Sequence, residues 1–253
     1  MLSKQLGSPL CGEKMRMSMK IKSILKSLVG DKMLGRYDYL LKPKLADSWG
    51  GAFNGQNYRQ RIFLDLIRSL PISAIVETGT FRGTTTAFLA KTGLPVYTVE
   101  SNPRFYAYAA LRFCRRRDRV HLYEGDSVNF LRHMADLNEF LMPKVLFYLD
   151  AHWEEHLPLQ EELEIIFSKW SDAVVLIDDF QVPGTTYGFD DYGPGKALTM
   201  SYLEPLQHLH LSAFFPATEA EQETGAKRGC VVLCKDEVVK NILNDIESLT
   251  SRL

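Results

Sequence analysis

Residues 74–86 read Ala-Ile-Val-Glu-Thr-Gly-Thr-Phe-Arg-Gly-Thr-Thr-Thr, a short apolar run followed by two closely spaced glycines. Gly79 and Gly83 let the backbone turn tightly and approach a ligand without an intervening Cβ. The residues after Gly83 would begin a helix whose first N–H groups are free to bind a ligand. This stretch predicts a strand, a ligand-binding turn and a helix, although a purely structural turn would have the same pattern.

Short apolar runs and longer helical stretches alternate along the rest of the chain. Most of the runs are continuous, which is typical of strands buried on both faces of a parallel sheet. The alternation predicts an open, doubly wound, mostly parallel α/β sheet, in which ligands bind beyond the carboxyl ends of the strands. The expected strands are 74–76, 96–99, 120–123, 145–149, 173–177, 209–215 and 230–233, and the expected helices are 57–70, 84–91, 104–115, 128–139 and 158–169.

Two adenosine-containing ligands commonly use a glycine turn of this kind, NAD and S-adenosylmethionine (SAM). The dinucleotide fingerprint places glycine at its first, third and sixth positions. Counting from Gly79 as the first position, Phe81 stands at the third and Thr84 at the sixth, so two of the three fingerprint glycines are absent. Glu100 ends the second run about 20 residues past the turn, where a carboxylate can bind both ribose hydroxyls. Glu100 favours an adenosine ligand but does not choose between NAD and SAM.

The glycine turn, Glu100 and the Gly125-Asp126-Ser127 sequence together resemble a class I SAM-dependent methyltransferase, and most closely the small-molecule O-methyltransferases without the middle glycine. The resemblance implies a seven-stranded Rossmann-like sheet in the order 3-2-1-4-5-7-6, with an antiparallel last strand. It places the methionine part at Glu77 and Gly79, the ribose at Glu100 and the adenine at Asp126. Asp126 or Ser127 could equally cap the next helix, and both roles can hold at once. The implied cofactor contacts are Glu77, Thr78, Gly79, Thr80, Gly83, Thr84, Thr85, Glu100, Ser101, Asp126, Ser127 and Asp150.

Acidic residues follow two further runs: Asp150 ends one, and the Asp178–Asp179 pair ends the next. If these strands are neighbours, their tips lie about 5 Å apart and the three carboxylates converge. Like charges at that distance need a counter-ion, and Mg²⁺ prefers oxygen ligands. The arrangement resembles metal-dependent O-methyltransferases of sugar and catechol type, which implies that Asp150, Asp178 and Asp179 bind Mg²⁺. Asp150 and His152 would be catalytic, with His152 as the general base.

Each of these residues also has a structural interpretation, since strand-end aspartates often cap turns and a lone histidine is often a surface residue. The glycine- and proline-rich segment 181–196 is expected to cover the substrate, with Tyr187 and Tyr192 stacking on it. Equally, these aromatic residues could pack on the body of the protein. Upstream, residues 49–56 resemble the segment that folds over the cofactor in related enzymes, where Gln56 and Arg59 would be weak contacts.

Residues 1–56 are predicted to form a basic helical extension or lid, and residues 57–253 the methyltransferase domain. The first 47 residues hold ten basic and four acidic side chains, whereas the whole chain has a formal charge of −1. Ile21, Ile24, Leu25 and Leu28 have the spacing of an amphipathic helix. Such a helix can bind an anionic membrane surface, but docking on its own domain is the favoured interpretation. The extension could also pack in a homodimer.

Composition excludes several classes of protein. The chain is 45% apolar and 24% charged, without the basic excess of most nucleic-acid-binding proteins and without an apolar run long enough to span a membrane. Four unpaired cysteines indicate a reducing, cytoplasmic location. The leading hypothesis is a SAM-dependent, Mg²⁺-assisted O-methyltransferase acting on a small hydroxyl-bearing molecule. The alternatives are an NAD-dependent oxidoreductase and a non-catalytic SAM-binding module.

Overall fold

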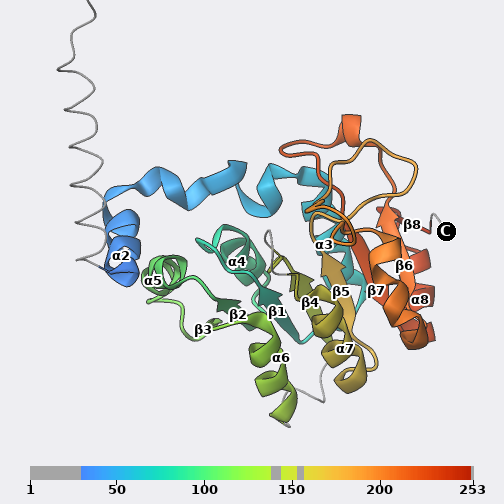
Figure 1. The fold of residues 1–253 in the computed structure, drawn as a ribbon, viewed down its shortest axis with the longest axis horizontal. Coiled ribbons are helices and arrows are strands. Elements are labelled where there is room, and N and C mark those ends of the chain that lie inside the picture. Colours follow the sequence, from blue (N-terminus) through green and yellow to red (C-terminus); the bar gives the residue numbers. More distant parts are fainter. Residues whose placement is uncertain (1–29, 138–143, 153–156, 252–253) are drawn as a thin grey trace, which may run out of the picture.

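The structure is a computed structural model that describes residues 30–137, 144–152 and 157–251. Its centre is an eight-stranded sheet in the order β3-β2-β1-β4-β5-β7-β6-β8 (Figure 1). Strands β1 to β5 pair in parallel, and β7 lies antiparallel between β5 and β6. The strands are β1 (Ala74–Thr78), β2 (Val96–Glu100), β3 (Val120–Glu124), β4 (Val145–Leu149), β5 (Val174–Ile177), β6 (Ser212–Pro216), β7 (Val231–Cys234) and β8 (Leu249–Thr250).

The predicted order 3-2-1-4-5-7-6 and the antiparallel β7 are confirmed, but the predicted number of seven strands is wrong. The eighth strand, β8, has two residues and pairs with β6 through Phe215 and Thr250. So short a strand carries no hydrophobic pattern of its own. The expected strand 209–215 also begins later, because residues 200–209 form a 3-10 helix and His210 then adopts a left-handed conformation (φ 52°).

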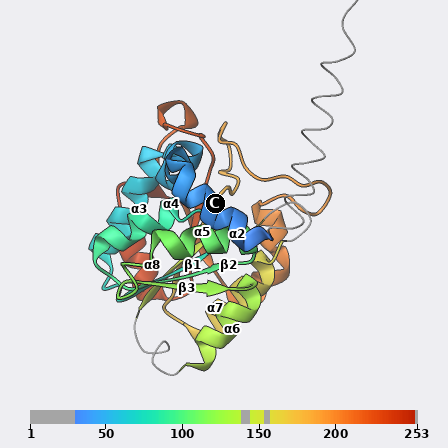
Figure 2. The same ribbon diagram turned by 90° about the vertical axis from the view of Figure 1, so that its left-hand side faces the viewer.

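Helices cover both faces of the sheet, as a doubly wound fold requires. Helices α3, α4, α5 and α8 bury their apolar stripes on one face, and α6 and α7 on the other. Figure 2 shows α2 lying against α5 at the outer side of the first group. The helices are α2 (Asp31–Leu41), α3 (Asn57–Ser69), α4 (Thr84–Leu89), α5 (Pro103–Arg112), α6 (Ser127–Asp136), α7 (Leu159–Lys169) and α8 (Glu237–Asn244).

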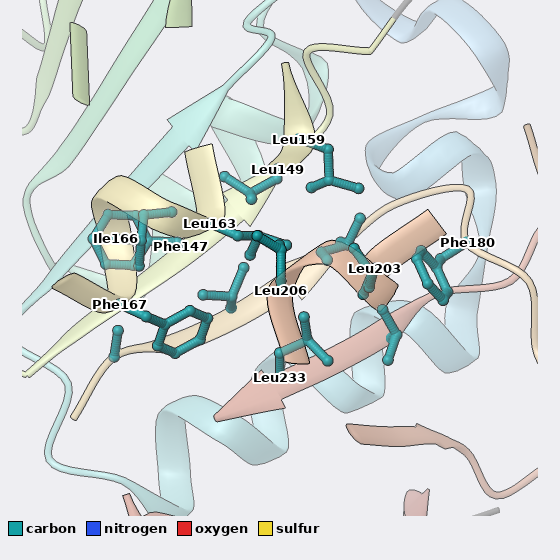
Figure 3. Packing of buried hydrophobic residues seen from close by; sticks show 14 of the residues in the cluster. Phe147, Leu149, Leu159, Leu163, Ile166, Phe167, Phe180, Leu203, Leu206 and Leu233 are labelled. Atoms are coloured by element: carbon teal, nitrogen blue, oxygen red, sulfur yellow. The ribbon is translucent and has the colours of Figure 1, made fainter. Parts of the chain in front are cut away.

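The core on the α7 side is almost entirely aliphatic and aromatic (Figure 3). Phe147 and Leu149 of β4 lie in this core together with Leu163 of α7 and Leu206 of the 3-10 helix Met200–Leu209. Each such buried side chain stabilises the fold by about 1.5–3 kcal/mol relative to its exposed state. This packing fixes the carboxyl ends of β1, β4 and β5, from which the site residues project.

The described part of the N-terminal region runs from α2 over α4 to α3, through 3-10 turns at Pro43–Gly50 and Ala52–Gly55 (blue in Figure 1). It is fastened to α4 by two hydroxyls: Thr84 Oγ1 donates to the Ala46 carbonyl (2.9 Å), and Thr85 Oγ1 accepts from the Phe53 N–H (3.2 Å). The predicted helix around Ile21 and Leu28 lies outside the described residues. In the described part of the chain, no helix is long and apolar enough to cross a bilayer.

Candidate active site

The turn after β1 packs directly against the end of β4. Gly79 has φ +89°, and a Cβ added there would lie 2.4 Å from the carbonyl oxygen of Asp150. Only glycine allows both this conformation and this approach. Phe81, at the position of the fingerprint's middle glycine, also has positive φ (50°), and its ring packs on Phe105 with the centroids 4.4 Å apart. The turn therefore keeps a glycine-like backbone without the glycine.

Glu77 lies beneath this turn rather than at its surface. Its Oε2 accepts hydrogen bonds from the hydroxyls of Thr86 (2.5 Å) and Thr98 (2.6 Å). Thr98 also shares a 2.6 Å hydrogen bond with the hydroxyl of Thr80. Burial raises the pKa of Glu77 to about 7. Glu77 and Thr80 therefore fix the shape of the turn from within.

Glu100 joins the tip of β2 to the same turn. Its carboxylate accepts from the backbone N–H groups of Phe81 (2.6 Å) and Asn102 (2.7 Å). Burial raises its pKa, and these backbone donors oppose the effect. Ser101, the next residue, is exposed at the strand end. The structure thus places Glu100 beside the glycine turn, where the resemblance expects a ribose.

Asp126 caps α6 by accepting from the Asn129 N–H (2.9 Å), as its structural interpretation predicted. Before it, Gly125 has φ +150°, and a Cβ added there would meet no atom within 4 Å. Ser127 is buried at the first position of the helix. The β3 end therefore offers open space next to a capped helix, which is compatible with an adenine.

The three predicted carboxylates do converge. Asp150, Asp178 and Asp179 each present an oxygen within 4.8 Å of the others. Parallel pairing of β4 with β5, in which Leu149 lies opposite Ile177, puts them at the same edge of the sheet. The Tyr148 hydroxyl donates to Asp178 Oδ2 (2.6 Å) and lies 3.4 Å from Asp150 Oδ2.

Arg59 of α3 forms a buried ion pair with Asp178 in this cluster, a role that the sequence did not predict. It also lies 3.7 Å from Asp179 and donates to the carbonyl oxygen of Gly229 (2.8 Å). Gln56 exchanges two 2.8 Å hydrogen bonds with the backbone of Arg228. Both side chains therefore face the β7 end of the sheet rather than the glycine turn.

A second guanidinium lies at the outer side of the cluster. Arg228 Nε is 2.8 Å from Asp179, and its Nη2 pairs with Asp190. When all are ionised, the two arginines and the four neighbouring carboxylates sum to a formal charge of −2. The carboxylates are those of Asp150, Asp178, Asp179 and Asp190. Burial raises the pKa of Asp150 well above its ordinary value, and the neighbouring Asp179 raises it further, whereas Arg59 opposes the effect.

His152 lies close to these residues. It is buried, and neither ring nitrogen has a hydrogen-bond partner among the described residues. Burial lowers its pKa, opposed by Asp179 and Asp190, so the imidazole is neutral near pH 7. The Tyr192 hydroxyl donates to Asp190 (2.5 Å) and lies 3.4 Å from the carbonyl oxygen of His152. The other predicted substrate contact, Tyr187, is packed in the core, and within the described structure its hydroxyl has no partner.

Neither a protein-family model nor a curated protein matches this sequence. Among solved structures, it is similar to the SAH-bound Podospora anserina methyltransferase PaMTH1, with 17% identity, a TM-score of 0.52 and coverage of 93% of this chain and 100% of that one. The cofactor-bound Rv0187 from MTB has 18% identity, a TM-score of 0.50 and coverage of 81% and 97%. The SAM complex of the O-methyltransferase TomG from Streptomyces achromogenes has 19% identity, a TM-score of 0.49 and coverage of 70% and 79%. At these identities the likeness to PaMTH1 and Rv0187, whose TM-scores are 0.50 or more, shows the fold alone, and it confirms the expected Rossmann-like methyltransferase architecture.

Proposed function

We propose that this chain, which has the fold of the class I methyltransferases, is an enzyme that transfers a methyl group from SAM to a hydroxyl of a small molecule, with Mg²⁺ assisting. The observation that carries the proposal is the packing of Gly79 against Asp150. Through this contact the candidate cofactor turn lies next to the carboxylate cluster. Transfer chemistry requires this proximity, because donor and acceptor must meet in line.

The strand ends suit an adenosyl ligand. Gly79 supplies a tight turn without a Cβ, Glu100 a buried carboxylate, and Gly125 open space beyond β3. Thr84 and Thr85 already bond to the N-terminal segment, so their backbone N–H groups, rather than their hydroxyls, would face the ligand. The remaining proposed contacts are Glu77, Thr78, Thr80, Gly83, Ser101, Asp126, Ser127 and Asp150.

The carboxylate cluster suits a divalent cation. Its donors are all oxygens, which Mg²⁺ prefers, and its carboxylates outnumber the two arginines that pair with them. Asp150, Asp178 and Asp179 would hold the metal, while Arg59 and Tyr148 fix the position of Asp178. When bound, SAM would supply the methyl group, and Mg²⁺ would act as a Lewis acid on the acceptor hydroxyl.

His152 is our candidate for the general base. Its buried, neutral imidazole has an unused nitrogen that can accept the proton of the acceptor hydroxyl. Tyr192 and Asp190, bonded to each other beside it, would orient that acceptor. Tyr187 would support the loop from the core rather than stack on the substrate.

Calorimetry with SAM, S-adenosylhomocysteine and NAD tests the cofactor. We expect binding of the first two and none of NAD; NAD binding without SAM binding would contradict the proposal. Transfer of labelled methyl from SAM to a panel of polyols and phenols then tests the activity. Asp150→Asn should reduce turnover at least about 100-fold, as should chelation of divalent cations. Asp245→Asn, an exposed aspartate at the end of α8, is the matched control and should act like the parent.

The two alternatives make different predictions in these assays. An NAD-dependent oxidoreductase is not favoured, because Phe81 and Thr84 replace two glycines of the dinucleotide fingerprint. Tyr192 and Lys196 have the spacing of the Tyr-x-x-x-Lys pair that a short-chain dehydrogenase would need, but they flank a turn rather than lying on a helix. A non-catalytic SAM-binding module would bind SAM in the calorimeter but transfer no methyl group to any acceptor in the panel.

A further inference from the structure

One buried acid, Glu162 of α7, has no part in the chemistry proposed above. It is fully buried, whereas the side chains of the nearby Glu161 and Glu164 are 54% and 42% exposed. Neither carboxyl oxygen of Glu162 has a hydrogen bond of good geometry with a described residue. A buried carboxyl without such a partner costs folding free energy, and groups of this kind are concentrated at functional sites. Glu162 is therefore a candidate for a functional role rather than a packing role.

The Glu162 carboxyl lies beside two hydroxyls from different elements. They belong to Ser127, the first residue of α6, and to Thr78, the last residue of β1, and both residues are buried. Burial raises the pKa of Glu162 to about 7, and the two hydroxyls are close enough to the carboxyl to oppose the rise. Helices α6 and α7 pack side by side (Figure 1), so Glu162 reaches both residues from the α7 side of the sheet.

Both neighbours of Glu162 belong to the backbone that would form the cofactor site. Thr78 immediately precedes Gly79, and its carbonyl oxygen accepts a hydrogen bond from the Asp150 N–H (3.0 Å). Ser127 begins α6 at the β3 end, where we place the adenine. A carboxyl can accept a hydrogen bond from one hydroxyl and, when protonated, donate one to another. The position of the Glu162 carboxyl therefore affects both the glycine turn and the adenine end of the site.

A structural role alone does not account for Glu162. It lies in the apolar stripe of α7 between Leu159 and Ile166, where an apolar side chain of similar size would stabilise the fold more. It is not needed to cap α6, because Asp126 is the cap of that helix. A favourable interaction with the first turn of α7 is already supplied by the exposed Glu161, without the cost of burial.

We propose that Glu162 is a positioning residue of the candidate cofactor site, which holds Ser127 and Thr78 in place for an adenosyl ligand without touching that ligand. The inference rests on the proposed function, because it gives Glu162 a part in the binding of SAM. It predicts that changes at Glu162 alter the cofactor affinity without a matching loss of fold stability.

Calorimetry with S-adenosylhomocysteine, combined with urea denaturation at pH 7, tests the proposal on the full chain. Glu162→Leu should weaken binding at least about tenfold, which corresponds to the loss of one hydrogen bond. Its free energy of unfolding should not fall, because an apolar side chain replaces a buried carboxyl. Glu162→Gln keeps a donor and an acceptor and should recover most of the lost affinity. Glu161→Leu changes the exposed acid one position earlier and should bind like the parent.

Double-mutant cycles with Ser127→Ala and with Thr78→Val show whether Glu162 acts through these two hydroxyls. Each substitution should weaken binding in the parent but add no more than about a twofold loss to Glu162→Leu. Unchanged affinity of Glu162→Leu, additive losses in both cycles, or a loss of affinity matched by a loss of stability would overturn this inference and leave the proposed function standing. Failure of the parent chain to bind S-adenosylhomocysteine would overturn both.

Discussion

The guanidinium of Arg59 pairs with Asp178 where α3 meets the end of β5, and both side chains are almost fully buried, with exposed fractions of 1% and 0%. Removing one partner leaves the other charge buried without compensation. We therefore expect Arg59→Ala to lower the free energy of unfolding by about 3–5 kcal/mol, measured by urea denaturation.

Arg61, two residues along the same helix, supplies the control for this prediction. Its side chain is 50% exposed and its ion pairs are at the surface, so Arg61→Ala should change stability by no more than about 0.5 kcal/mol. Adding Asp178→Asn to Arg59→Ala should recover part of the loss, because the stranded charge is then gone. Equal losses for the two arginine variants would show that the buried pair does not stabilise the fold.

The sequence could predict where the carboxylates converge but not what balances them. Asp150 and the Asp178–Asp179 pair directly follow continuous apolar runs, and parallel strands end at one edge, so their meeting followed from local pattern. Arg59 reaches them from a helix about 120 residues earlier, and hydrophobic periodicity says nothing about such a contact.

A signal for the missed residues was nevertheless present. Arg59 occupies the apolar stripe of α3, at i relative to Ile62, Phe63 and Leu66. Glu162 likewise lies within the apolar stripe of α7, between Leu159 and Ile166, and is also fully buried. A charged residue within an apolar stripe predicts a buried partner or a shifted pKa, although it does not name the partner.

The turn at Gly79 allows a prediction about the cofactor. Gly79→Ala would place a methyl group 2.4 Å from the Asp150 carbonyl in a left-handed backbone, so the turn must move. We expect SAM affinity to fall at least about 100-fold by calorimetry, because the backbone of the turn would form the cofactor contact.

Gly93→Ala separates the effect of a positive φ from the effect of the contact with Asp150. Gly93 has a similar φ (+84°), but a Cβ there would meet no atom within 4 Å. This variant should lose stability by about 1 kcal/mol and keep its SAM affinity. If both variants lost SAM affinity equally, backbone strain rather than the contact with Asp150 would be responsible.

Glu162 predicts a pH dependence of stability. Burial raises its pKa to about 7, above the ordinary value of 4.5. The folded state therefore holds a proton that the unfolded state releases between these values, and the stabilisation present below pH 4.5 is lost as the pH rises through about 7. Burial also raises the pKa of Glu77 to about 7, so Glu77 affects the free energy of unfolding in the same direction. Together they should make the free energy of unfolding decline across this window.

Glu162→Gln removes one of these two protons and resembles the protonated carboxyl in shape. Urea denaturation between about pH 5 and 8 should show a decline that is shallower by up to about 1.4 kcal/mol per pH unit. Glu161→Gln changes an exposed neighbour and should keep the parent slope. A Glu162→Gln slope equal to that of the parent would show that this carboxyl titrates normally.

His152 provides the prediction that bears most directly on the proposed chemistry. A glutamine at this position keeps a polar side chain of similar length but cannot accept a proton as imidazole does. In the proposed methyltransferase, His152→Gln should lower kcat by about 10²–10⁴-fold and leave the SAM dissociation constant nearly unchanged. His208→Gln, at an exposed histidine that pairs with Glu164, should leave both quantities at the parent values. A His152→Gln variant with full turnover would exclude the base assignment, whereas loss of SAM binding without a further loss of kcat would show that the buried imidazole shapes the cofactor pocket instead.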